Sequence, residues 1–146
     1  MASEELDRDL CKLIHRFAHR MDVQARRVAD SLEMTATQVI ALRELSEPIT
    51  SRELAERMSC EPSNVTFVLD RLEQQQLVER RPHPTDRRAR QLVLTPAGKR
   101  RRAAVVKRLS EHSPVDNLTE AQQETLRTLL QRAASPSTSK EANQQP

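Results

Sequence analysis

Apolar residues recur at helical spacing near the start of the chain. Within residues 5–29 they form one stripe, made of Leu6, Leu10, Leu13, Ile14, Phe17 and Met21. Lys, Arg and Asp residues occupy the other directions around this segment. Because residues three and four apart share one face of an α-helix, the pattern predicts a long amphipathic helix over residues 5–29.

Capping residues predict where further helices begin. A Thr with Gln or Glu three positions later forms a capping box, and a Thr followed by Pro marks a first turn. Such starts stand at Thr35, Thr50, Thr95 and Thr119, and Pro62 opens another helix. The predicted helices cover residues 35–46, 51–58, 61–75, 97–111 and a segment after Thr119. In that last helix the spacing predicts burial of Leu126, Leu129 and Leu130.

Two segments between the helices have strand-like composition. LVERR at 77–81 and RQLVLT at 90–95 flank PHPTDRRA, which is rich in Pro, Thr and Asp like a hairpin loop. A short helix, a tight connection, a helix and a hairpin follow one another in a winged helix-turn-helix, expected here over residues 35–95. The predicted fold class is therefore mainly α with a small β-wing at residues 77–95.

Composition agrees with a helical core. The 146 residues have room for one domain, taken as residues 1–146, and aromatic residues make up 1% of the chain, namely Phe17 and Phe67. A core of Leu, Val, Ile, Ala and Met favours helices over a β-sandwich. Beyond Ala134 the chain is polar, so residues 135–146 are expected to form a disordered tail.

The charge is unevenly distributed along the chain. Residues 80–108 carry eleven of the 24 Lys and Arg residues and one acid, Asp86. A cationic face of this kind is typical of a protein that is steered onto DNA phosphates. A membrane-surface protein would instead place its cations on a helix opposite Trp or Phe. Since the N-terminus also lacks an apolar segment of signal-peptide length, a cytoplasmic protein without membrane contact is expected.

Candidate DNA contacts gather at the starts of two predicted helices. Ser63, Asn64 and Thr66 begin the helix at 61–75, where short polar side chains can hydrogen-bond to base edges or phosphates. Arg71, further along, could meet a phosphate or pair with a nearby glutamate. The preceding helix adds Thr50 and Ser51.

The predicted wing holds the second group of candidates. Asp86 stands two residues before Arg88, close enough for its carboxylate to orient the guanidinium toward a narrow minor groove. The residues expected to line the DNA backbone are Arg80, Arg81, Arg87 and Arg90. The alternative interpretation is a solvated basic hairpin that serves solubility alone.

The segment ELAERMSCEPSNVTFVLDRLEQQQLVERRPHPTDRRARQLVLTPAGKR resembles the MarR family of multiple-antibiotic-resistance regulators, and the resemblance covers about residues 30–102. It implies a homodimeric transcription factor whose first and last two helices, residues 5–29 and 97–133, join the subunits. It also implies pseudo-palindromic operators and repression. A small phenolic or anionic effector would sit between the dimer helices and the DNA-binding lobe.

The sequence departs from the family at one turn. Where the family commonly has Gly before the leucine at position 77, this chain has Gln76. A left-handed backbone conformation at the end of a helix is least costly for Gly. Gln76 therefore either accepts about 1 kcal/mol of strain, or the turn differs.

Cys11 resembles in position the reactive cysteine of the family's organic-hydroperoxide-sensing branch. That branch holds its thiol with nearby tyrosines, and this chain contains none. Redox sensing at Cys11 is one hypothesis, and a small apolar residue on a helix face is the other. Cys11, His15 and His19 follow one another at intervals of four, but each interval turns about 40° away from the apolar face, so no metal site is expected.

These features predict a sequence-specific DNA-binding transcription regulator, a repressor acting as a homodimer on double-stranded DNA. Release is expected through a small ligand or through oxidation of Cys11. The alternative is a winged-helix module for protein–protein contact, which would not need Asp86 and Arg88 in a basic loop. No enzyme and no cofactor are expected, because the single Gly98 excludes a phosphate-binding glycine loop and no nucleophile–base pair can be assigned.

Overall fold

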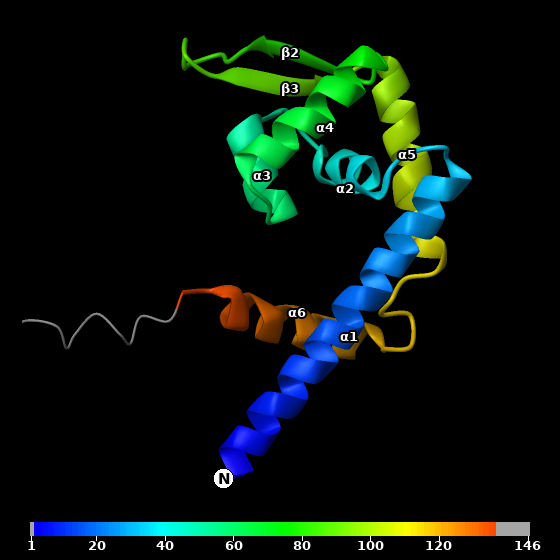
Figure 1. The fold of residues 1–146 in the computed structure, drawn as a ribbon, viewed down its shortest axis with the longest axis vertical. Helices are drawn as coiled ribbons and strands as arrows, with labels where there is room; N and C mark the ends of the chain where they lie inside the picture. The colour runs from blue at the N-terminus through cyan, green and yellow to red at the C-terminus, as the bar shows by residue number, and fades with distance from the viewer. Residues whose placement is uncertain (1, 137–146) are drawn as a thin grey trace, which may run out of the picture. The chain divides into compact units, whose positions relative to one another are not determined.

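The computed structural model describes residues 2–136, and the chain divides into two compact units, residues 1–113 and residues 114–146. The elements of the first unit are α1 (Ala2–Ser31), α2 (Ala36–Glu44), β1 (Ile49–Thr50), α3 (Ser51–Met58), α4 (Pro62–Gln74), β2 (Val78–Pro82), β3 (Arg90–Leu94) and α5 (Pro96–Glu111) (Figure 1). The described part of the second unit contains α6 (Glu120–Ala134). The predicted class, mainly α with a small β-wing, is confirmed.

Helix starts follow the predicted capping residues. Thr35, Thr50 and Thr119 each accept a hydrogen bond from the backbone N–H three residues later, and the Gln or Glu at that position accepts one in return. The hydroxyl of Thr95 accepts from the N–H of Gly98 and opens α5 in the same way. α1 begins earlier than predicted, at Ala2, and continues to Ser31.

The sheet has one strand more than the predicted hairpin. β2 and β3 pair antiparallel, from Val78 opposite Leu94 to Pro82 opposite Arg90. β1 joins the other edge of β3, which makes the strand order β1-β3-β2. Because β1 has only two residues, it has no alternation of apolar and polar positions that a sequence could reveal.

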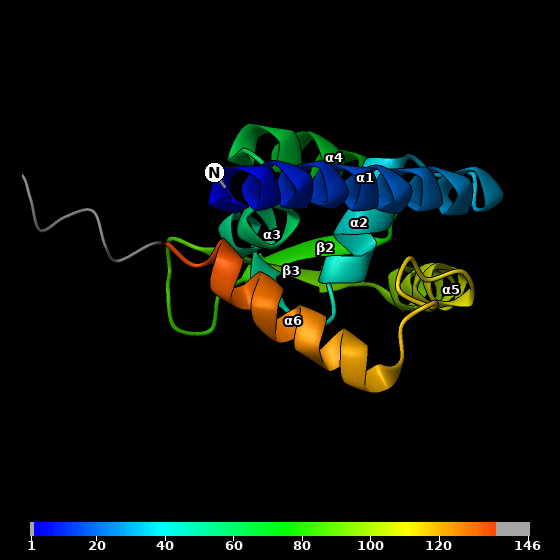
Figure 2. The same ribbon diagram turned by 90° about the horizontal axis from the view of Figure 1, so that it is seen from below.

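The core of the first unit is aliphatic and surrounds α2. Leu42 of α2, Leu54 of α3, Leu69 and Leu72 of α4 and Leu92 of β3 are almost completely buried. α2 contacts α1, α3, α4 and α5, an arrangement that can be followed in Figure 2. The winged helix-turn-helix elements are therefore held around one central helix.

Arginines of α5 bind the ends of two other helices. Arg101 donates to the carbonyl oxygen of Leu32 at 2.9 Å, and Arg102 donates to that of Arg43 at 3.1 Å. The carbonyls at a helix C-terminus lack partners within the helix, and cations there also interact favourably with the helix dipole. Part of the basic run of residues 80–108 thus has a structural role.

Two backbone positions connect α4, the hairpin and α5. Gln76 has a φ of 59°, so it adopts the left-handed conformation and the first of the two alternatives for this turn is the one observed. Gly98 lies where a Cβ atom would come within 1.9 Å of the carbonyl oxygen of Leu77. The single glycine of the chain therefore permits a close approach between α5 and the turn before the wing.

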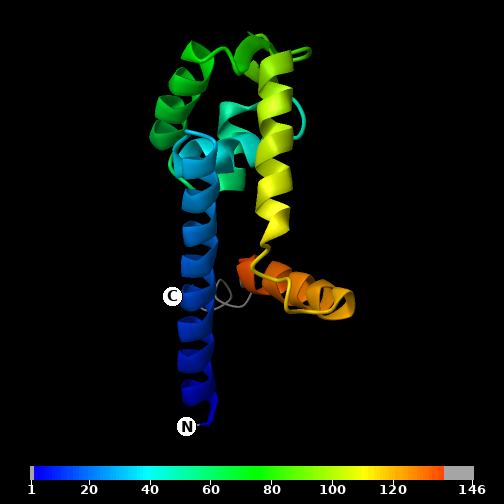
Figure 3. The same cartoon turned by 90° about the vertical axis from the view of Figure 1, so that its right-hand side faces the viewer.

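The N-terminal half of α1 is uncovered by the rest of its unit. Leu6, Leu10, Leu13, Ile14 and Met21 are exposed, and fully buried residues of α1 start at Ala25. Figure 3 shows this half of α1 projecting beyond the other elements of the first unit. The apolar stripe predicted from the sequence is thus present and unpaired within the first unit.

The prediction that the last helix buries its leucines is wrong for the single chain. Leu129 and Leu130 of α6 are exposed, and no residue of α6 is fully buried. α6 is the one helix in the described part of its unit, so that unit offers it no second helix to pack against.

Two further sequence expectations concern the tail and the membrane. The tail was expected to be disordered over residues 135–146. Residues 137–146 of this segment lie outside the described residues. Within residues 2–136 no helix combines the length and the apolar character that crossing a membrane requires.

Candidate nucleic-acid interface

α4 has one buried face and one face open to solvent. Val65, Val68, Leu69 and Leu72 are buried against the lobe. Ser63, Asn64 and Thr66, predicted to contact DNA, are all exposed. Each residue of an α-helix turns the side chain by about 100°, so Asn64 and Thr66 lie on opposite sides of Ser63. The three residues therefore border the solvent-facing surface and do not form one cluster.

The hydroxyl and amide groups of α4 differ in their availability. Thr66 donates its hydroxyl hydrogen to the carbonyl oxygen of Pro62 at 3.2 Å, which leaves the hydroxyl oxygen as an acceptor. Asn64 borders a cavity on the inner side of α4. Ser63 stands at the solvent-facing start of the helix.

Thr50 and Ser51 have different roles at the start of α3. The Thr50 hydroxyl accepts from the N–H of Glu53 at 3.2 Å, and the Thr50 N–H donates to the Glu53 carboxylate at 2.8 Å. Thr50 also pairs with Gln91 in the sheet. It therefore positions α3, whereas Ser51 is exposed on the first turn.

Arg57 anchors the other end of α3. Its guanidinium donates to the Glu47 carboxylate at 2.6 Å and to the carbonyl oxygen of Glu44 at 3.1 Å. The hydrogen bond to the Glu47 carboxylate raises the pKa of Arg57 above its ordinary value, so the guanidinium is charged at every physiological pH.

Two wing arginines are held by acids of the protein itself. Arg80 lies 2.7 Å from the Asp70 carboxylate and 3.1 Å from that of Glu73. Arg81 lies 2.8 Å from the carboxylate of Glu79. Both were expected to line the DNA backbone, but each guanidinium is already neutralised by a carboxylate. Arg71, by contrast, is exposed and forms no ion pair within residues 2–136.

The Asp86 carboxylate contacts backbone where a side-chain contact was expected. Its Oδ1 atom accepts from the backbone N–H of Arg88 at 3.0 Å, and no ion pair with that guanidinium occurs within the described residues. Asp86 therefore shapes the loop by an Asx-type turn and leaves the Arg88 side chain free. The expectation that it orients the guanidinium is corrected.

His83 contributes to the same loop and had no role in the sequence interpretation. Its Nδ1 atom accepts from the backbone N–H of Thr85 at 3.2 Å and from that of Asp86 at 3.1 Å. The His83 N–H donates to the carbonyl oxygen of Ala89 at 3.2 Å, which closes the loop. A histidine preceding a Pro-Thr-Asp turn is the signal that could have indicated this.

The organised loop presents a cationic tip. Arg87, Arg88 and Arg90 are exposed, and none of them has a carboxylate partner in the part of the chain that the structure describes. Unpaired guanidinium groups bind phosphate and base edges with planar, directional hydrogen bonds. The wing tip is therefore an exposed cationic surface that is available to a ligand.

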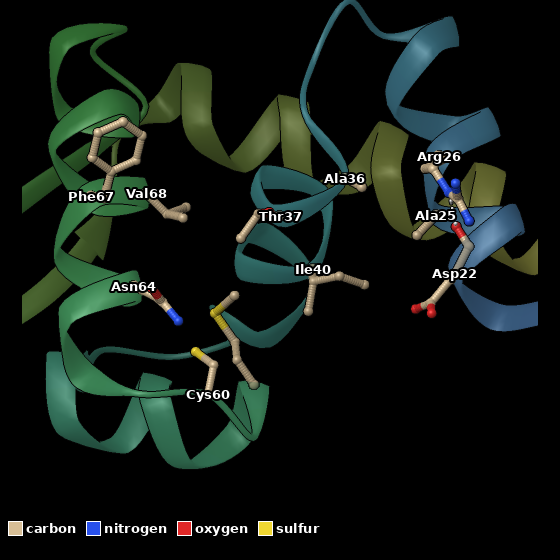
Figure 4. Close-up of a pocket in the computed structure, with 11 residues that line it drawn as sticks. Asp22, Ala25, Arg26, Ala36, Thr37, Ile40, Cys60, Asn64, Phe67 and Val68 are labelled. Atoms are coloured by element: carbon tan, nitrogen blue, oxygen red, sulfur yellow. Dashed lines mark hydrogen bonds between the residues drawn. The ribbon is translucent and has the colours of Figure 1, made fainter. Parts of the chain in front are cut away.

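A cavity of about 600 Å³ lies between α1, α2 and α4. Asp22 and Arg26 line it from α1, Thr37 and Ile40 from α2, and Asn64, Phe67 and Val68 from α4 (Figure 4). Cys60 and Met58 add sulfur atoms from the end of α3 and the residues after it. The cavity thus touches both the long first helix and the helix predicted to read DNA.

Cys11 lies elsewhere, on the exposed half of α1. The predicted redox role therefore concerns an accessible thiol that is not part of the cavity. Among residues 2–136 no group of three or more His, Cys, Asp and Glu residues is placed to hold a metal ion.

α3 and α4 form a helix-turn-helix, α4 has one face open to solvent, and the cationic hairpin of β2 and β3 follows it. These features define a winged helix-turn-helix protein of the nucleic-acid-binding class. Residues 34–89 match the model of the MarR family. The matched residues include α2, α3, α4 and β2, so the chain is similar to the MarR family over most of its winged helix-turn-helix.

Two curated proteins of Bacillus subtilis strain 168 are similar to the chain. One is the organic hydroperoxide resistance transcriptional regulator, 30% identical over 96 residues that cover 64% of this chain and 65% of that protein. The other is the uncharacterised HTH-type transcriptional regulator YsmB, 29% identical over 116 residues that cover 77% and 80%. The match thus spans just under two thirds of the length of the first relative.

Solved structures extend the similarity to most of the chain. MarR from E. coli has a TM-score of 0.67 and 28% identity, covering 86% of this chain and 96% of that one. A mutant of the same protein complexed with operator DNA also has a TM-score of 0.67, with 28% identity and 87% and 94% covered. The repressor CouR bound to a 23-mer DNA duplex has a TM-score of 0.73 and 25% identity, with 90% and 96% covered.

Proposed function

We propose that the protein is a homodimeric repressor that occupies a pseudo-palindromic operator in double-stranded DNA. α4 would lie in the major groove, and the wing would reach the backbone or the minor groove beside it. The observation that carries this proposal is the group of unpaired arginines at the wing tip, next to an exposed helix with polar residues at its start. The similar MarR structure complexed with operator DNA and the similar CouR structure bound to a 23-mer DNA duplex support DNA as the partner.

The uncovered apolar stripe of α1 supports a dimer. Leu6 and Leu13 are 61% and 56% exposed, in a helix whose opposite side is charged. A contiguous apolar surface of this kind on a protein of this class is covered by a subunit partner. The exposed leucines of α6 would join this interface, consistent with the dimer helices at 5–29 and 97–133 expected from the family resemblance.

The proposed activity is binding alone, without a cofactor or a catalytic step. Repression follows when an occupied operator excludes the transcription machinery from a promoter. Because the target is chromosomal DNA, the proposed place of action is the cytoplasm.

Two release signals belong to the proposal. A small phenolic or anionic effector would bind in the cavity between α1, α2 and α4, which has a volume suited to such molecules and offers the Arg26 guanidinium to an anion. Since the cavity touches α1 and α4 together, a bound molecule would alter how α4 is presented relative to the dimer helices. Oxidation of the exposed Cys11 is the second signal.

Titration with salt tests the DNA-binding proposal. The purified protein first selects its operator from a random duplex library, and affinity is then measured by fluorescence anisotropy. If about six to ten phosphates are contacted, affinity should fall by about 10³- to 10⁵-fold between about 50 and 200 mM salt. A flat response, or no enrichment of any sequence, would contradict the proposal and favour a protein-contact module.

Light scattering during size exclusion tests the dimer. Leu13→Glu places a charge in the stripe and should yield monomers. Lys12→Glu is the matched control, because Lys12 points away from the stripe and the new charge stays in solvent. A dimer that survives Leu13→Glu would exclude this face of α1 from the interface.

A further inference from the structure

Phe67 is the most exposed large apolar side chain among the described residues. It is 78% exposed, although it is one of two aromatic residues in the whole chain and the other, Phe17, is partly buried. Covering an exposed aromatic ring with another molecule lowers the free energy, because apolar surface is removed from water. Such rings are enriched where proteins bind partners. Phe67 is therefore a candidate contact residue.

Its place on α4 indicates which partner covers it. Ser63 lies one turn before Phe67, and both point to the solvent side, opposite the buried Val65 and Leu72. In Figure 4 the side chains of Asn64 and Val68 point toward α2, whereas the ring of Phe67 lies over α4 at the edge of the cavity. The ring thus belongs to the same surface as the polar start of the helix.

The first two turns of α4 carry no charged side chains. The helix segment from Pro62 to Leu69 contains no Lys, Arg, Asp or Glu. The first acid, Asp70, is bound to Arg80, and cations for phosphate are supplied by the wing. Two turns of α4 therefore present hydroxyl, amide and aromatic groups, which suit base edges better than phosphates.

We propose that Phe67 is a specificity-determining residue that contacts the C5-methyl group of a thymine in each operator half-site. The methyl group is the apolar feature of the major groove, and of the four bases only thymine carries it. The Ser63 hydroxyl, on the same face of α4, then hydrogen-bonds to a neighbouring base, while the ring excludes water from the methyl group. The inference rests on the proposed operator binding and adds the identity of one base contact.

Deoxyuridine substitution tests the contact, because it removes the methyl group and retains the base pairing. The selected operator is resynthesised with one thymine at a time replaced in both half-sites, and each duplex is titrated with the full-length protein. At one position per half-site, removal of the methyl should weaken binding about fourfold, or about fifteenfold for the two together, the size of effect expected for one buried methyl group.

Variants assign the effect to the ring. Phe67→Ala should bind the thymine operator more weakly and should bind thymine and deoxyuridine duplexes equally at the sensitive position. Phe67→Leu, which retains apolar contact, should keep part of the discrimination. Gln74→Ala, an exposed residue at the far end of α4, is the matched control and should keep all of it. Circular dichroism establishes that each variant is folded.

The outcomes separate this inference from the function on which it rests. Failure to select any operator overturns operator binding itself. An operator without a methyl-sensitive position overturns the Phe67 contact and leaves operator binding intact. Unchanged discrimination between thymine and deoxyuridine by Phe67→Ala also overturns the Phe67 contact. If Phe67→Ala changes only the response to ligands of the cavity, the ring belongs to the effector site instead.

Discussion

Arg80 of β2 lies against Asp70 of α4, with the Nη2 atom 2.7 Å from the Oδ1 atom. The Nε atom of the same guanidinium is 3.1 Å from the carboxylate of Glu73, one turn further along the helix. One cation thus joins the hairpin to two carboxylates of the helix. The wing and the predicted recognition helix are held together before any DNA arrives.

Arg80→Ala should affect stability and leave phosphate contact unchanged. The pairs are partly exposed, so their loss should lower the free energy of unfolding by only about 1 kcal/mol. Because Arg80 is already neutralised, the slope of log affinity against log salt should stay the same. Urea denaturation and salt titration measure the two quantities, and a shallower slope would assign Arg80 to a phosphate.

Arg88→Ala should show the opposite pattern. Its guanidinium is exposed and has no carboxylate partner in residues 2–136, so operator binding should weaken by about 1 to 3 kcal/mol while the dimer and its melting temperature are unchanged. Arg81→Ala is the comparison, since Arg81 is paired with Glu79 and should lose less. Operator binding as tight as that of the parent would rule out the wing contact.

Gly98→Ala should destabilise the lobe. The new methyl group would lie 1.9 Å from the carbonyl oxygen of Leu77, which belongs to backbone and cannot rotate away. Displacing α5 from the turn should cost about 1 to 3 kcal/mol in urea denaturation. Ala103→Ser, at an exposed position of α5, should change little. A Gly98→Ala protein as stable as the parent would show that α5 shifts freely.

Gln76→Gly should stabilise the protein. Gln76 has a φ of 59°, and glycine adopts this conformation without the steric cost of a Cβ atom. Since the hydrogen bonds at this position involve only the backbone of Gln76, the gain should be about 0.5 to 1 kcal/mol, seen as a higher melting temperature. Gln75→Gly is the control: its φ is −80° and its side chain accepts from Gln38, so the same change should destabilise.

Cys11→Ser tests the redox hypothesis. Organic hydroperoxide would oxidise the thiolate to a sulfenic acid and be reduced to the alcohol, which should release DNA from the parent protein. Cys11→Ser should stay bound under the same treatment, and Cys60→Ser should respond like the parent. Gel-shift titration distinguishes these results. Equal release from parent and Cys11→Ser would leave Cys11 as a small helix-face residue.

The sequence predicted the features that depend on local spacing. Capping boxes located the starts of several helices. The missing glycine identified the turn at Gln76 but left two alternatives open, and the observed φ of 59° is the strained one. Features that depend on pairing across the fold were not predictable in this way. β1 is recognised through its pairing with β3, where Ile49 lies opposite Leu92. Arg80 contacts Asp70 at a separation of ten residues, and no sequence periodicity connects these two positions.

The same limit explains the correction at Asp86. Two residues of separation allow a carboxylate to contact either the backbone N–H or the side chain of Arg88. Spacing does not distinguish the two, whereas the closure of the loop by His83 and Ala89 favours the backbone contact. The excess of positive charge over residues 80–108 has the same limit. It does not separate the arginines that bind helix ends from those that remain free.

The uncovered half of α1 has a consequence for dosage. If a second copy covers that stripe, mass action governs how much of the protein is competent to bind an operator. Below the dimer dissociation constant the dimer concentration rises with the square of the subunit concentration. While most operators are free, a twofold change in the amount of protein then changes operator occupancy more than twofold, which makes the response of the regulated genes steeper than that of a monomeric repressor.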